Sequence, residues 1–89
     1  METVILRTNP RKDNTGLKIT YEVIGSGASG EAMRQAIRGL ENYPARAERR
    51  ALVDVLGLIE AGRYQVCHVE HGPDPDAEGV EYWLFLLQR

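Results

Sequence analysis

The chain contains one segment in which apolar and polar side chains alternate, Leu17-Lys18-Ile19-Thr20-Tyr21-Glu22-Val23-Ile24. Successive side chains of a β-strand point to opposite faces of a sheet. The odd-numbered positions of this segment are all apolar, whereas polar side chains dominate the even-numbered positions. The pattern predicts a strand with one face in the core and one face largely in water.

The residues before this segment predict a partner strand. Residues 2–8 contain the β-branched and apolar run Val4-Ile5-Leu6, and Asn9-Pro10 follows it. Residues 9–16 are polar, and Asn14 and Gly16 accept positive φ at low steric cost. We therefore expect the first two strands to form a hairpin across a loop at residues 9–16.

The residues after it predict two helices. Ser29 is the expected N-cap of the first helix, with Glu31 in its first turn, where a carboxylate suits the helix dipole. Pro44 is the expected first residue of the second helix, and Gly62 is its expected left-handed C-terminal residue. Both helices carry apolar residues at helical spacing, which are Met33, Ala36, Ile37 and Leu40, then Leu52, Val55, Leu56 and Ile59.

The last third of the chain predicts two more strands. Residues 63–70 have strand character, residues 71–79 hold two prolines and two glycines and predict a loop, and residues 80–88 predict the final strand. Both faces of that strand are apolar, with Trp83, Phe85 and Leu87 on one side. The order ββααββ predicts a single α+β domain over residues 1–89, with a four-stranded antiparallel sheet and two helices packed on one face.

The length and composition of the chain argue against a membrane-spanning, a secreted or a disulfide-bonded protein. The chain has 89 residues, 43% of them hydrophobic, and a net charge of −2, which is typical of one globular domain. The longest apolar run, Tyr82–Leu87, is far too short to span a bilayer, and residues 1–7 lack the features of a secretory signal. Cys67 is the single cysteine, so no intrachain disulfide is possible. These features favour a cytoplasmic protein.

The sequence contains one glycine pattern and one cluster of potential metal ligands, and we interpret both as structural rather than functional. Gly25, Gly27 and Gly30 match G-x-G-x-x-G, but the next element is a second helix rather than a parallel strand, which favours a flexible connection over a dinucleotide site. An anion at the helix N-terminus stays an alternative. Residues 67–76 hold potential metal ligands, yet they lack the spacing of a closed site. We expect no cofactor, no metal and no catalytic residues.

Arginines on the two predicted helices suggest a phosphate track. They are interleaved with acidic residues, which favours solvated helix faces and makes nucleic-acid binding a secondary hypothesis. The arginines concerned are Arg34, Arg38, Arg46 and Arg50.

Acidic residues gather near the C-terminus. Residues 64–88 contain five acidic residues and no lysine or arginine. Such a cluster attracts arginine-rich surfaces, including those that hold nucleic-acid phosphates, although a solubilising loop is the alternative. The candidate protein-binding residues of this acidic hairpin are Glu70, Asp74, Asp76, Glu78 and Glu81. We expect its charges to be solvated. The apolar face with Trp83, Phe85 and Leu87 is a second candidate interface, and we expect a second copy of the chain, a curled sheet edge or the target itself to cover it.

Residues 9–24 resemble part of a small phage-encoded anti-CRISPR protein, from a group that inhibits type I-E CRISPR effector complexes. The resemblance covers Pro10-Arg11-Lys12, Asn14-Thr15-Gly16, Thr20 and Val23, followed by an alanine-containing helix. It implies a non-enzymatic, stoichiometric inhibitor that binds a host CRISPR effector (a Cascade-like complex) and blocks DNA access, without binding nucleic acid or membrane itself. The alternatives are a homodimeric structural or regulatory module and a small nucleic-acid-binding module that uses the helix arginines.

Overall fold

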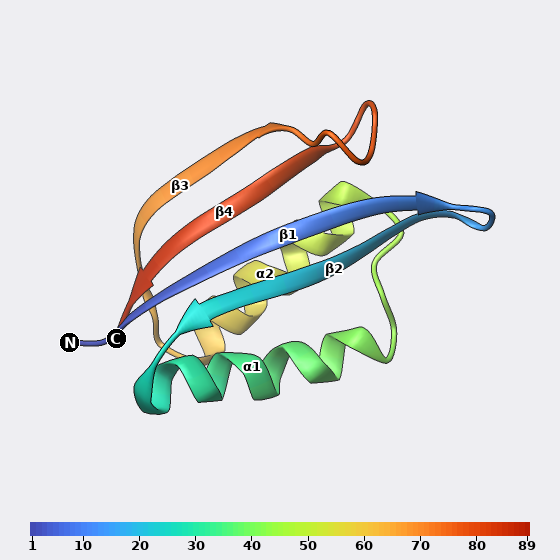
Figure 1. The fold of residues 1–89 in the computed structure, drawn as a ribbon. Coiled ribbons are helices and arrows are strands. Elements are labelled where there is room, and N and C mark those ends of the chain that lie inside the picture. Colours follow the sequence, from blue (N-terminus) through green and yellow to red (C-terminus); the bar gives the residue numbers. More distant parts are fainter.

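A computed structural model describes all residues from 1 to 89 and has the predicted order ββααββ. The elements are β1 (Thr3–Asp13), β2 (Gly16–Gly25), α1 (Gly27–Glu41), α2 (Glu48–Ala61), β3 (Gln65–Pro73) and β4 (Glu81–Gln88). The strands form one antiparallel sheet in the order β2-β1-β4-β3. Both helices lie on one side of the sheet, α1 beside β2 and α2 behind the central strands (Figure 1). The predicted α+β fold is therefore confirmed.

The core lies between the helices and one face of β2, β1 and β4. Val4 and Leu6 of β1 are fully buried, and Phe85 and Leu87 of β4 pair with them across the sheet. Ile19 and Tyr21 of the alternating segment also face the core, as their spacing predicts. The helices contribute their periodic apolar residues, which include Met33, Ile37, Val55 and Ile59.

The first hairpin is longer than its residues predict. β1 runs through Pro10 to Asp13, and only Asn14 and Thr15 form the turn before Gly16, which has a φ of 112°. Pro10 fits within a strand because β1 pairs with β4 only over residues 3–7, so beyond that point one side of β1 is a sheet edge. Asp13 Oδ1 accepts hydrogen bonds from the N–H and hydroxyl of Thr15, and these bonds lower the pKa of Asp13.

The helix boundaries also differ from expectation. α2 begins at Glu48, not at Pro44, because Ala45 instead forms a bridge with Ile19 at the edge of β2. Gly62 is right-handed, with a φ of −83°, and Arg63 takes the positive φ of 58°. A glycine suits position 62 for another reason, because a Cβ there would overlap the ring of Tyr64. Tyr64 is buried and donates a hydrogen bond to the carbonyl of Ser29.

A carboxylate from the N-terminal segment caps α1. The prediction that Ser29 is the N-cap is wrong, because Ser29 lies inside the first turn of α1. The N-cap is Ser26, which makes no side-chain capping bond. Instead the N–H of Ser29 donates to Glu2 Oε1 at 2.9 Å. Hydrogen bonds from Ser29 are the main cause that lowers the pKa of Glu2. The N-terminus of α1 is therefore capped by a carboxylate of the chain itself.

This cap predicts a pH-dependent contribution to stability. The pKa of Glu2 is lower in the folded chain than in the unfolded chain, so ionised Glu2 stabilises the fold. This stabilisation is present at pH values above the pKa of Glu2 in the unfolded chain. It is lost as the pH falls through the pKa of Glu2 in the folded chain. We expect Glu2→Gln to lower the Tm at neutral pH and to leave a smaller difference from wild type at acid pH. Thermal melts of both proteins across this pH range test it, and a difference that stays constant with pH would contradict the cap.

Candidate functional site

The β3–β4 hairpin ends in a loop that is folded on itself. The N–H of Asp74 donates to the carbonyl of Val80 at 3.1 Å, and the N–H of Val80 donates to the carbonyl of Ala77 at 3.1 Å. Ala77 is 1% exposed, although it lies in the middle of the loop. The loop is thus closed by backbone bonds and anchored by a buried side chain, so its conformation is set before any partner binds.

Asp74 is an internal residue of this loop. Its side chain is 1% exposed, lies 3.4 Å from Arg7 Nη2 and 3.9 Å from Arg11 Nη1, and accepts a hydrogen bond from the N–H of Asp76. The expectation that the loop charges are solvated is wrong for Asp74. The cause lies in β1, whose extension beyond residue 7 carries its arginines alongside the hairpin, a placement that local sequence does not reveal.

The other four acidic residues of the hairpin are exposed to different degrees and lie in different surroundings. Asp76 is 3.4 Å from Arg11, and Glu78 accepts a bond from Lys12 through its backbone carbonyl, which leaves its carboxylate free. Glu81 lies 3.0 Å from His71. Glu70 accepts a hydrogen bond from the Tyr82 hydroxyl, which raises the pKa of Tyr82. The structure therefore brings only Asp76 and Glu78 together at the exposed end of the loop, next to the basic residues of β1.

The predicted apolar interface on β4 is part of the core. Phe85 is 3% exposed and Leu87 is fully buried, because the helices cover this face of the strand. Trp83 is half-buried and packs against the same core, with its ring stacked on His71 at 4.4 Å. The assignment of Phe85 and Leu87 to an intermolecular surface is therefore wrong. The opposite face of β4, with Tyr82, Leu84 and Leu86, is only half-buried.

The edge strand β3 is the most exposed element. Val66 and Val69 lie on the helix side of the sheet, opposite Leu87 and Phe85, yet they remain 40% and 42% exposed because no helix covers this edge. A register shift between Val66 and His68 interrupts the strand at Cys67, which is exposed. No group of three or more potential metal-ligating side chains lies together in the structure.

Most of the helix arginines have partners within the chain. Arg34 pairs with Glu31 at 3.7 Å and donates to the carbonyl of Gly25, while Arg50 pairs with Asp54 at 3.2 Å. Arg46 lies in the connection before α2 rather than on a helix, because α2 begins at Glu48, and it donates to the hydroxyl of Thr15. Arg38 makes no ion pair with a carboxylate. These internal bonds weaken the hypothesis that the four arginines form one track for phosphates.

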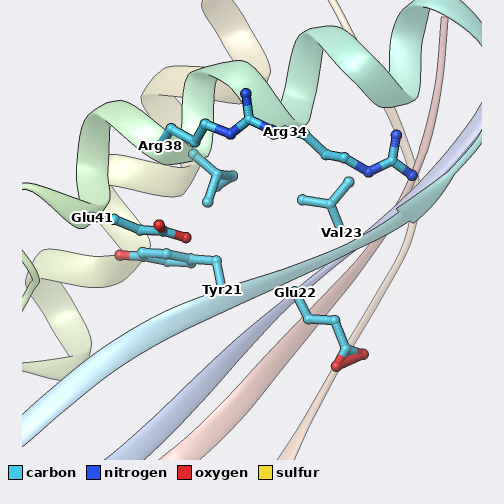
Figure 2. A pocket seen from close by; sticks show the side chains of 7 residues that line it. Tyr21, Glu22, Val23, Arg34, Arg38 and Glu41 are labelled. Atoms are coloured by element: carbon cyan, nitrogen blue, oxygen red, sulfur yellow. The ribbon is translucent and has the colours of Figure 1, made fainter.

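A cavity of about 340 Å³ lies between β2 and α1, where sequence reasoning placed no site. Tyr21 and Val23 line it from β2, and Arg34, Ile37 and Arg38 line it from α1 (Figure 2). The Tyr21 hydroxyl is buried without a hydrogen-bond partner, and burial raises the pKa of Tyr21 to about 12, so the phenol stays protonated. No local sequence pattern indicates this cavity, because the cavity depends on the position of β2 at the edge of the sheet.

Comparisons with protein-family models, with curated proteins and with solved structures found no match to this chain. Neither α1 nor α2 combines the length and the hydrophobicity that a membrane-spanning helix needs.

Proposed function

We propose that this chain is a non-enzymatic inhibitor that binds a host type I CRISPR effector complex through the loop at residues 74–80. The preorganised loop is the observation that carries the proposal. Its exposed carboxylates, Asp76 and Glu78, stand on a backbone that hydrogen bonds and the buried Asp74 already hold in place. A basic surface can therefore bind them with little loss of loop entropy.

The charge of this loop suits a surface that normally receives DNA. The Glu78 carboxylate has no partner within the chain, and Asp76 is held by Arg11, which is itself half-exposed and can be displaced. Arginine and lysine side chains that bind DNA phosphates also bind carboxylates. The resemblance of residues 9–24 to an anti-CRISPR protein suggests which DNA-binding surface this is. The proposed place of action is the cytoplasm of the host cell.

The proposal predicts that reversing the two exposed charges abolishes inhibition. We expect wild-type protein to reduce DNA binding by a purified type I effector complex in a band-shift assay. The Asp76→Lys/Glu78→Lys variant should lose this effect and keep nearly the wild-type Tm, because exposed charges contribute little to stability. Asp74 is left unchanged because its side chain is internal.

The control is Glu31→Lys/Glu60→Lys, which alters net charge equally at exposed positions on α1 and α2. It should inhibit like wild type. Inhibition retained by the loop variant would remove the loop from the mechanism. Failure of the wild-type protein to inhibit would contradict the proposed function.

A further inference from the structure

β2 is an edge strand whose outward backbone groups can be identified from their contacts. The N–H of Ile19 donates outward to the carbonyl of Ala45 at 2.9 Å, and the carbonyl of Gly25 accepts a bond from Arg34. In an antiparallel strand the N–H and C=O of one residue point to the same side, and this side alternates along the chain. Tyr21 and Val23, which lie between these two residues, therefore also direct their backbone groups away from β1.

The outward groups of Tyr21 and Val23 have no partner within the chain. Neither residue takes part in the backbone hydrogen bonds outside the regular elements, and no side chain bonds to them. The chain thus closes its own edge at Ile19 and at Gly25 and leaves it open between them. This open stretch coincides with the cavity of about 340 Å³ between β2 and α1.

The walls of the cavity indicate the chemistry of an occupant. Ile37 and Val23 provide apolar surface, and the side chains of Arg34 and Arg38 extend over it from α1 (Figure 2). Glu41 lies at one end, whereas Glu22 points away from α1 (Figure 2). Two arginines and two glutamates line the groove, but Arg34 is paired with Glu31 and the Glu22 side chain points away from α1 (Figure 2). Arg38 is therefore the cation of the lining that has no carboxylate partner.

We propose that an extended acidic peptide binds in this groove by adding a strand to the free edge of β2. Its backbone pairs with the N–H and C=O groups of Tyr21 and Val23, which is the mode called β-augmentation. Every second side chain of the added strand then lies on the helix side, next to the side chains of Tyr21 and Val23. A carboxylate at such a position meets Arg38, which has no competing ion pair. Backbone pairing supplies affinity, and the arginine supplies the preference for acidic residues.

The probe is a blocked, fluorescently labelled peptide of alternating valine and aspartate, compared with the same peptide carrying lysine in place of aspartate. Fluorescence polarisation measures binding to the full chain. We expect the aspartate peptide to bind and the lysine peptide to bind at least about tenfold more weakly, because each charge is reversed against the arginines. Amide hydrogen exchange at Tyr21 and Val23 should slow when the aspartate peptide is present.

Val23→Pro tests the backbone pairing. It removes the outward N–H of Val23 and leaves the bonds between β1 and β2 intact, so we expect the peptide to stop binding. The matched control is Val69→Pro on the other edge strand. The N–H of Trp83 points toward β1, because it donates to the hydroxyl of Thr8. Backbone groups alternate in direction along a strand, so those of Leu84 point toward β3 and pair with Glu70. Val69, next to Glu70, therefore directs its N–H outward. This variant should bind the peptide like wild type.

Arg38→Glu tests the charge preference without a change of backbone. We expect it to weaken binding of the aspartate peptide about fivefold to tenfold, while Arg49→Glu, an exposed arginine on α2, leaves binding unchanged. The proposal is overturned by the absence of binding at millimolar peptide, or by equal binding of both peptides. It is also overturned by unchanged binding to Val23→Pro, or by a homodimer that occupies this edge of β2 in sedimentation experiments.

Discussion

Asp74→Ala lowers the free energy of unfolding by about 2–3 kcal/mol, at or just below the lower end of the cost of breaking a buried ion pair. The loss is this large because Asp74 is 1% exposed and its carboxylate contacts Arg7, Arg11 and the N–H of Asp76. It stays near the lower end because the arginine side chains are 26% and 49% exposed and regain water when Asp74 is removed. Urea denaturation of the two proteins measures the difference.

Asp76→Ala is the matched control for this result. Asp76 belongs to the same loop and also pairs with Arg11, but its side chain is 61% exposed. We expect its removal to change the free energy of unfolding by no more than about 0.5 kcal/mol. Equal effects of the two substitutions would mean that Asp74 is solvated in the folded chain, and the loop would then lack its internal anchor.

Phe85→Ala lowers the free energy of unfolding by about 3–5 kcal/mol, because it removes a buried aromatic ring from the centre of the sheet. Phe85 is 3% exposed and pairs with Leu6 of β1, which is fully buried. Total stabilities of small domains are about 5–15 kcal/mol, so the variant should be largely unfolded at mild denaturant concentrations. Urea denaturation measured by circular dichroism tests this expectation.

The same variant separates a core position from an interface position. If Phe85 formed an interface between two copies, its removal would dissociate a dimer and would leave the folded monomer nearly as stable as before. Leu84→Ala is a useful comparison, because Leu84 lies on the open face of β4 and is only half-buried. We expect it to cost distinctly less than Phe85→Ala at every protein concentration.

The element order could be predicted from the sequence because local periodicity determines it. The alternation at residues 17–24 identifies β2 and its buried face, and the helical spacing around Ile37 and Val55 identifies the core sides of α1 and α2. Strand boundaries were less predictable. A proline normally marks the end of a strand. Pro10 is tolerated within β1 only because one side of β1 lacks a neighbouring strand at that point.

The burial of individual side chains could not be predicted in the same way, because it depends on contacts between distant segments. Asp74 and Asp76 look equivalent in sequence, yet only Asp74 meets Arg7 from the far end of the chain. The cap of α1 comes from Glu2, which lies 27 residues from Ser29. Both faces of β4 look equally apolar, and only the position of the helices makes the side with Phe85 internal.

Direct titration of a purified type I effector complex with this protein tests whether the loop at residues 74–80 binds a basic surface. We expect wild-type protein to bind with an affinity that falls as salt is raised, because exposed charge pairs are screened. We expect Asp76→Lys/Glu78→Lys not to bind. Binding of the variant with wild-type affinity, independent of salt, would mean that the loop carboxylates do not bind the complex.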